Sequence, residues 1–154
     1  MTREVIGFIM VMLVFSIATL VAIGYRRKSK LETEQIAPLP VAVDCSGVEC
    51  MYVSTVYAES PLRRLLAHGM GPRGRATVSV TEEGISVCRI GERDYLIPKS
   101  TIRSVGKSSA TIDRAVEPGG LVSVEWSHQG TDLITNLRFS DSDSRKVFEG
   151  KVLA

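Results

Sequence analysis

Residues 75–90 read RATVSVTEEGISVCRI, and this stretch determines the kind of fold that the sequence predicts. Residues 75–81 alternate apolar and hydroxyl-bearing side chains, which is the period of two expected for a half-buried strand. Residues 81–84 (TEEG) predict a tight turn, with Gly84 at the position that needs a positive φ. Residues 85–90 return as a second strand, so the stretch predicts an antiparallel hairpin.

Further strand-like segments lie on both sides of this hairpin, separated by short turns. They are rich in β-branched and aromatic residues or alternate as the hairpin does, and they comprise residues 51–57, 95–97, 111–113, 121–127 and 132–140, with a short segment anchored by Ile102 and Val105. Residues 140–154 (SDSDSRKVFEGKVLA) offer Ser and Asp as N-caps and predict one short helix. We therefore expect a mainly β domain of about seven antiparallel strands, bent into an open barrel and capped by a C-terminal helix.

An apolar segment precedes the β region. Residues 5–25 (VIGFIMVMLVFSIATLVAIGY) carry no charged side chain, and a helix of this length spans about 31 Å, close to the hydrocarbon thickness of a bilayer. We expect one transmembrane helix here, after a tail of residues 1–4. A cleaved signal peptide is the alternative, but the segment is long for one and bases follow it directly, which favours an uncleaved anchor.

Four bases flank the C-terminal side of this helix: Arg26, Arg27, Lys28 and Lys30. They outnumber Arg3 on the other side, so the positive-inside rule predicts a single-pass plasma-membrane protein whose C-terminal domain is cytoplasmic. The same bases can attract anionic lipid headgroups, at roughly 1 kcal/mol per base near the surface.

A linker joins the helix to the domain. We expect residues 26–44 to form a basic juxtamembrane segment and linker, with Pro38 and Pro40 favouring an extended form over residues 31–44. Residues 45–154 then form the domain. The first 30 residues hold five bases and one acid, which leaves 14 bases and 16 acids of the totals of 19 and 17. The domain is thus slightly acidic, and a strongly basic nucleic-acid binder is not expected.

The sequence contains three cysteines, Cys45, Cys50 and Cys88, so they cannot all pair within one chain. Cys45 and Cys50 have a C-x4-C spacing, but no second Cys or His pair completes a zinc site, so no metal or cofactor is expected. In a cytoplasmic domain the thiols should be reduced. Outside the cell, Cys45 and Cys50 could instead close a small loop, leaving Cys88 as a small core residue of a strand.

Residues 59–74 (ESPLRRLLAHGMGPRG) interrupt the strand pattern, and we expect a short helical turn through Leu65 and Leu66, followed by a glycine-rich loop. Between Glu59 and Glu82 the chain has no acid. The basic side chains of this window are Arg63, Arg64, His68, Arg73 and Arg75. Two interpretations stay open. The arginines pair with acids elsewhere, or arginines and loop N–H groups together cradle an anion such as a lipid headgroup.

The order of elements matches a pleckstrin-homology-like (PH-like) barrel, and the chain resembles a family of actinobacterial single-pass membrane proteins that carry such a domain. The matching stretches are Tyr52-Val-Ser-Thr55, Pro61-Leu62, His68-Gly-Met-Gly71, Arg73-Gly-Arg-Ala76, Ile97-Pro98, Ile112-Asp-Arg114 and Val116-Glu-Pro-Gly119. The chain departs from the family at Pro72 and Ala110, where the relatives carry aromatic residues. The resemblance implies the barrel and the topology, but no reaction.

No stretch of the sequence carries a nucleophile elbow, a zinc-protease motif, a P-loop or a dinucleotide-binding fingerprint that precedes a helix. Asp113, Arg114 and Glu117 form a polar cluster that is typical of a salt-bridged turn. We therefore expect a non-enzymatic binding or scaffold module at the inner face of the plasma membrane, with a protein partner. Anionic headgroup or anion binding through the Arg63–Arg75 region is the alternative, and an enzyme is a more remote one.

Overall fold

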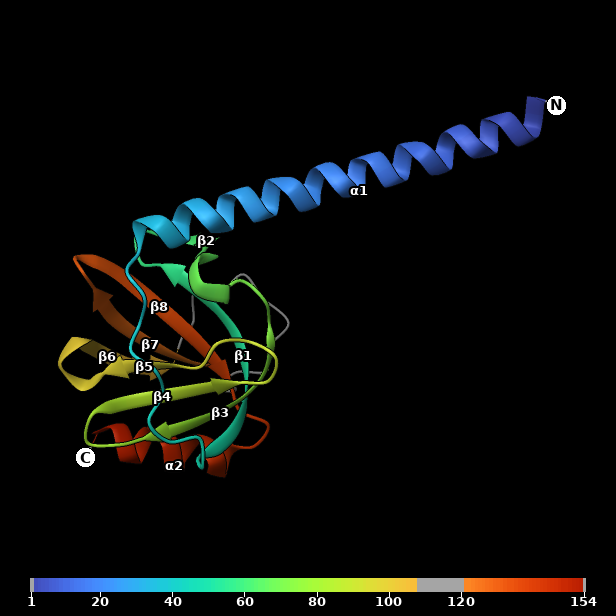
Figure 1. Ribbon diagram of the computed structural model, residues 1–154. Coiled ribbons are helices and arrows are strands. Elements are labelled where there is room, and N and C mark those ends of the chain that lie inside the picture. The colour runs from blue at the N-terminus through green and yellow to red at the C-terminus, as the bar shows by residue number, and fades with distance from the viewer. Residues whose placement is uncertain (1, 108–120, 154) are drawn as a thin grey trace.

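The computed structural model describes residues 2–107 and 121–153. Its first element is the long helix α1 (Thr2–Gln35), which Figure 1 shows running well beyond the rest of the molecule. Side chains from Val5 to Tyr25 are exposed, with Phe8, Phe15 and Leu20 each more than 60 % accessible. By length and composition, α1 is the one helix of the described residues that could cross a membrane.

The remaining elements form a bent antiparallel sheet followed by a helix. The strands are β1 (Val48–Tyr57), β2 (Ser60–Arg64), β3 (Gly74–Val80), β4 (Gly84–Arg89), β5 (Tyr95–Pro98), β6 (Ile102–Lys107), β7 (Leu121–His128) and β8 (Thr131–Arg138), with the short 3-10 turns η1 (Ala67–Gly69) and η2 (Lys99–Thr101). Their order in the sheet is β5-β4-β3-β1-β8-β7-β6, and β2 pairs with the end of β1. The predicted open barrel of about seven strands is confirmed.

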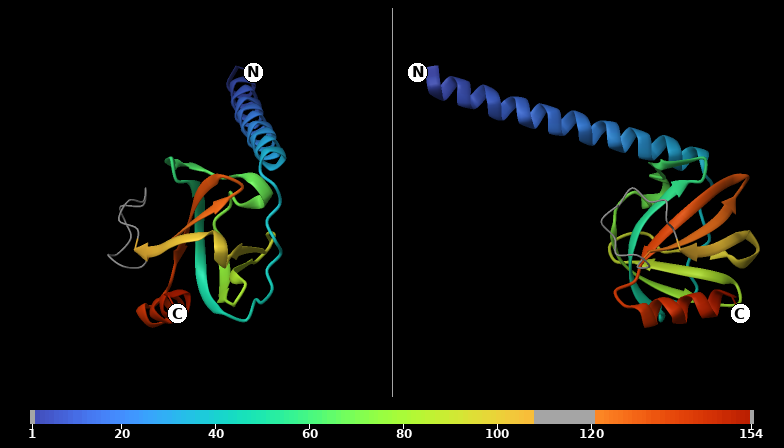
Figure 2. Two further views of the ribbon diagram at one scale, coloured as in Figure 1. Left: turned by 90° about the vertical axis from the view of Figure 1, so that its left-hand side faces the viewer. Right: turned by 180° about the vertical axis from the view of Figure 1, so that it is seen from behind.

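Helix α2 (Ser142–Leu153) closes the end of the barrel that is remote from α1 (Figures 1 and 2). Phe148 of α2 is buried and its ring lies 5.3 Å from that of Phe139, which follows β8. Asp141 N-caps the helix by accepting the Ser144 N–H at 2.6 Å. The predicted C-terminal capping helix is therefore confirmed.

The alternation predicted for residues 75–81 matches the core face of β3. Ala76 and Val78 of β3 are buried, and Val78 pairs with Val87 of β4 in register. Gly84 ends the turn with a φ of 145°, and a Cβ there would collide with the Ile97 carbonyl. The hairpin is thus held by packing on the core face and by a turn that only glycine fits.

The linker differs from its prediction. Residues 31–35 are helical rather than extended, because α1 continues for ten residues past Tyr25 and its last turns contact the barrel. Beyond Gln35 the chain lies on the barrel instead of holding it at a distance. The Pro40 carbonyl accepts the Leu96 N–H of β5 at 2.8 Å, and Leu39 is buried in the core. The linker therefore covers the free edge of β5.

The interruption between β1 and β3 also differs from its prediction. Residues 60–64 pair with β1 as strand β2, and the helical turn comes later, at Ala67–Gly69, rather than through Leu65 and Leu66. Leu65 turns inward and is fully buried, which ends the exposed strand. The strand predicted at residues 111–113 and the cluster of Asp113, Arg114 and Glu117 lie outside the described residues.

The cysteine pairing differs as well. A disulfide joins Cys45 to Cys88, whose Cα atoms are 5.7 Å apart, whereas the alternative predicted from spacing was Cys45 with Cys50. Cys50 points into the barrel and is 7 % exposed, so it cannot reach Cys45. Burial raises the pKa of the Cys50 thiol to about 12, which keeps it protonated and unreactive. The expectation of three reduced thiols does not hold in this structure.

Candidate functional site

The end of α1 docks onto the loop between β2 and β3, and we call this contact the helix–loop junction. It consists of Ser29, Glu32, Thr33 and Ile36 on the helix side and of Arg63 and Leu66–His68 on the barrel side. The Ser29 hydroxyl donates to the Leu66 carbonyl at 2.9 Å. The Thr33 hydroxyl accepts the His68 N–H at 3.1 Å, and the His68 ring nitrogen Nε2 lies 2.7 Å from the Ile36 carbonyl.

Glu32 is the centre of the helix–loop junction and is only 3 % exposed. Its Oε2 accepts the Leu66 N–H at 2.7 Å, and its Oε1 lies 3.7 Å from a guanidinium nitrogen of Arg63. Arg63 is held in turn over the ring of Tyr57, 4.4 Å from the ring centroid. A loop N–H and an arginine thus do hold an anion here, and that anion is a carboxylate of the chain's own helix.

The structure divides the five residues predicted to hold an anion. Arg63 and His68 belong to the helix–loop junction. Arg64 is exposed at the end of β2, and Arg73 is exposed just before β3. Arg75 is also exposed, but it lines a pocket that none of the other four lines. Anion binding by this set stays a prediction, and the loop groups in contact with Glu32 and Thr33 already have partners.

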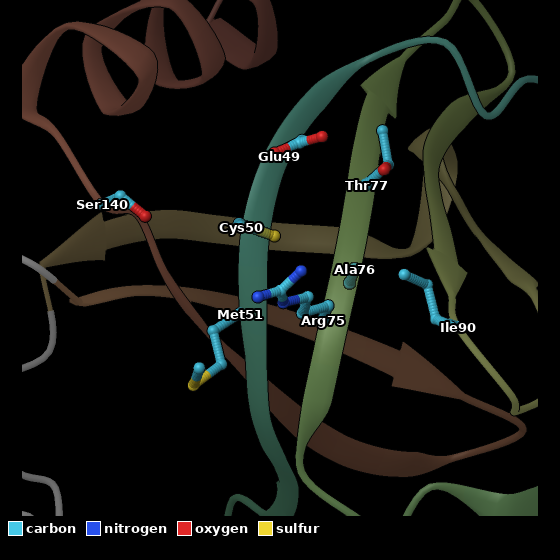
Figure 3. A pocket seen from close by; sticks show the side chains of 8 residues that line it. All are labelled: Glu49, Cys50, Met51, Arg75, Ala76, Thr77, Ile90 and Ser140. Atoms are coloured by element: carbon cyan, nitrogen blue, oxygen red, sulfur yellow. The ribbon is translucent and has the colours of Figure 1, made fainter.

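The pocket beside Arg75 is an open hollow of about 410 Å³ on the outer face of β1 and β3 (Figure 3). Figure 3 shows the Arg75 side chain lying next to Met51, with Glu49 farther along β1 and Ile90 on the other side. The pocket is shallow and holds one acid and one base, Glu49 and Arg75. This arrangement offers a surface for contact rather than an enclosed cavity for a reaction.

A buried arginine was missed in the sequence. Arg89, at the end of β4, is 5 % exposed, and its guanidinium carbon lies 4.7 Å from the centroid of the Tyr52 ring and 5.6 Å from that of Tyr95. It donates to the Gly69 carbonyl at 3.0 Å and to the Arg93 carbonyl at 3.2 Å. In the sequence Arg89 was indistinguishable from a solvent-facing base at a strand end.

The barrel also encloses a chain of hydroxyl groups. The Tyr52 hydroxyl donates to the Met70 carbonyl at 2.7 Å and lies 2.8 Å from the Thr55 hydroxyl. The Thr55 oxygen lies 3.0 Å from that of Thr135, and the Trp126 indole N–H donates to Thr135 at 3.0 Å. Burial raises the pKa of Tyr52 and of Tyr95, while the positive charge of Arg89 opposes both shifts. Both phenols are therefore neutral at physiological pH. The hydrogen-bonded hydroxyl groups link β1, β7 and β8 and fix how these strands pack.

Metal-ligand residues converge at one place among the described residues, where Cys45, Cys88 and Asp94 lie together. The two thiols are bonded to each other, so in this state the cluster offers a metal only the Asp94 carboxylate.

The bases that follow the apolar segment lie within α1, on its solvent-exposed surface. Arg26, Arg27, Lys28 and Lys30 are all exposed, and we call them the base collar. Directly before the collar, the Tyr25 hydroxyl reaches the barrel, since a Cβ on Gly71 would lie 2.5 Å from it. The loop that carries Gly71 and Arg73 is thus level with the end of the apolar segment.

Comparison with known proteins agrees with this architecture. None of the curated proteins compared with the chain matches it. The family model described as "Bacterial PH domain-like" matches residues 24–152, which include the last turns of α1, the linker, the sheet and α2. Because the match covers most of the chain, the protein belongs to the bacterial PH-domain-like family.

Proposed function

We propose that this protein is a membrane-anchored, non-enzymatic binding module that recruits a protein partner to the inner face of the plasma membrane. The family supports a binding or scaffold role. The apolar, exposed face of α1 supports an anchor, and the base collar supports a cytoplasmic domain.

The helix–loop junction is the observation that carries this proposal. A flexible tether would let the barrel take any orientation, and α1 would serve only to concentrate it at the membrane. Glu32, Thr33 and His68 instead fix the barrel to the last turns of α1. The junction thereby presents the same surface of the barrel to a partner in every copy, which lowers the ordering cost of binding.

The test weakens the helix–loop junction while leaving the anchor and the barrel intact. A variant with Glu32→Ala and Thr33→Val removes both acceptors that α1 offers to the loop. A hydrogen bond to a charged group contributes about 1.5–3 kcal/mol, so the Leu66 amide, which donates to Glu32, should exchange with solvent at least tenfold faster. The His68 amide donates to the neutral Thr33 hydroxyl, a bond worth about 0.5–1.5 kcal/mol, and should exchange faster by a smaller factor. The matched control is Glu34→Ala with Gln35→Ala, which changes two exposed residues of the same turn.

The functional measurement is proximity labelling by a ligase fused to the C-terminus. Wild-type and control chains should label the same partner, and the junction variant should label it much less at equal membrane abundance. A reproducible partner that the junction variant labels equally would contradict the role of fixed orientation. The absence of any partner from a folded, membrane-inserted wild-type chain would contradict recruitment itself.

A further inference from the structure

Three neighbouring strands align an exposed row of side chains on the outside of the barrel. Met51 of β1 is directly opposite Arg75 of β3 on one side and Arg138 of β8 on the other. Residues directly opposite in antiparallel strands point to the same face of the sheet. All three side chains are exposed, so Arg75, Met51 and Arg138 form one continuous outward-facing line.

Ile90 extends this line. Its backbone N–H donates to the Arg75 carbonyl at 3.2 Å, and its side chain is 77 % exposed, which only Leu62 equals among the large apolar residues that the structure describes outside α1. We call Ile90, Arg75, Met51 and Arg138 the basic row, in which apolar and cationic side chains alternate. Neither arginine has an ion pair with a described residue, and the nearest acid in the pocket is Glu49.

The helix–loop junction decides where the basic row points. In Figures 1 and 2, β1 and the chain that enters β3 lie on the side of the barrel turned toward the N-terminal end of α1. The chain between β5 and β6, yellow in Figure 1, lies on the opposite side. If α1 crosses a bilayer, the side with β1 faces the membrane, and the contact of Gly71 with Tyr25 brings the barrel up to the interface.

We propose that the basic row is a membrane-contact surface that binds the anionic lipid headgroups of the bilayer in which α1 is anchored. Arg75 and Arg138 contact phosphate groups, while Met51 and Ile90 insert between the headgroups. The base collar on α1 meets the same lipid layer, so the two cationic surfaces act together. This inference rests on the proposed function for the anchor and for the docked barrel.

The experiment uses the full-length chain in nanodiscs, with methyl-labelled isoleucine and methionine. A lipid with a paramagnetic gadolinium chelate on its headgroup reports which methyl groups approach the bilayer surface. The methyls of Ile90 and Met51 should relax strongly. Ile102, at the start of β6 on the opposite side, is the internal control and should relax weakly.

Lipid composition, salt and variants establish that charge is responsible. Relaxation at Ile90 and Met51 should be stronger in nanodiscs containing phosphatidylglycerol than in pure phosphatidylcholine, and should fall as salt is added. Arg75→Gln with Arg138→Gln should remove most of the difference between the two lipids. Arg103 lies on the opposite side and is 59 % exposed, so Arg103→Gln is the matched control. It should leave the difference in relaxation between the two lipids unchanged.

The outcomes that overturn this inference are distinct from those that overturn the anchor and the junction. If Ile102 relaxes as strongly as Ile90 or more strongly, the basic row is not the membrane-contact surface. Relaxation of Ile90 and Met51 that does not depend on lipid charge would also contradict the proposal. The contact of the loop with Glu32 and Thr33, read from the slow solvent exchange of the Leu66 and His68 amides, reports the junction independently. If that contact persists while Ile90 stays unaffected, the barrel is docked and the membrane-contact surface is wrong. If that contact is missing, the barrel is not docked on α1, and the result contradicts the junction itself.

Discussion

At the scale of single residues, one buried charge stands out, the guanidinium of Arg89 at the end of β4. Arg89 belongs to a predicted strand, in which the structure buries Ile85 and Val87 in the core. A guanidinium at that position is tolerated because two tyrosine rings and two backbone carbonyls meet it in the folded chain. Arg93 and Tyr95 are close to Arg89 in the sequence, but Tyr52 and Gly69 come from distant segments, so no local pattern could indicate the whole set.

Replacing Arg89 should therefore destabilise the barrel. Arg89→Ala leaves the Gly69 and Arg93 carbonyls without a buried donor and opens a space between Tyr52 and Tyr95, so we expect a loss of about 2–4 kcal/mol in the free energy of unfolding. Chemical denaturation of the full chain in detergent, followed by Trp126 fluorescence, measures this loss. Arg93→Ala changes an exposed neighbour and should cost less than about 0.5 kcal/mol. Equal losses in the two variants would contradict the assignment.

At the scale of elements, the sequence predicted those whose own side chains determine them. The hairpin of β3 and β4 follows from alternation and from Gly84, and α2 follows from its caps and apolar stripe. The end of α1 was predicted wrongly, since residues 31–35 are helical. Glu32 and Thr33 hold this last turn against the barrel, and their partners lie more than 30 residues away in the sequence. Two interpretations of the arginine-rich loop were open, an external anion or an acid elsewhere in the chain, and the structure places the Glu32 carboxylate against the Leu66 N–H and near Arg63.

The linker gives a prediction at this scale. The Cys45–Cys88 bond closes a loop with a sequence separation of 43 residues and holds the end of the linker against β4. The chain-entropy model gives about 4 kcal/mol for such a loop, so the oxidised chain should be more stable than the reduced chain by about 2–4 kcal/mol. Denaturation with and without reductant measures the difference.

Two variants separate the bond from other effects of the reductant. Cys88→Ser should make stability independent of reductant, at the level of the reduced wild-type chain. Cys50→Ala should keep the full dependence, since Cys50 is buried and forms no disulfide. A wild-type chain that reductant does not destabilise would show that the pairing contributes nothing to the fold.

At the scale of the whole molecule, two features point to opposite sides of the membrane. The base collar follows the apolar segment and favours a cytoplasmic barrel. The Cys45–Cys88 disulfide is typical of an oxidising compartment outside the cytoplasm. The collar acts when the helix inserts and decides its orientation, whereas a nearby thiol pair can exist in either redox state after folding. We therefore expect the collar to prevail and the pair to be reduced in the growing cell.

Reciprocal cysteine variants test this orientation. Glu83→Cys places a thiol in the exposed turn between β3 and β4, and Glu4→Cys places one at the exposed start of α1. In intact cells a membrane-impermeant maleimide should label Glu4→Cys and not Glu83→Cys. After permeabilisation it should label Glu83→Cys as well. Both variants are built on Cys45→Ser with Cys88→Ser, so that Cys50, which is buried with its pKa raised to about 12, is the one native thiol left and does not react. Labelling of Glu83→Cys from outside intact cells would place the barrel in the oxidising compartment, where the disulfide is permanent, and would exclude every cytoplasmic partner.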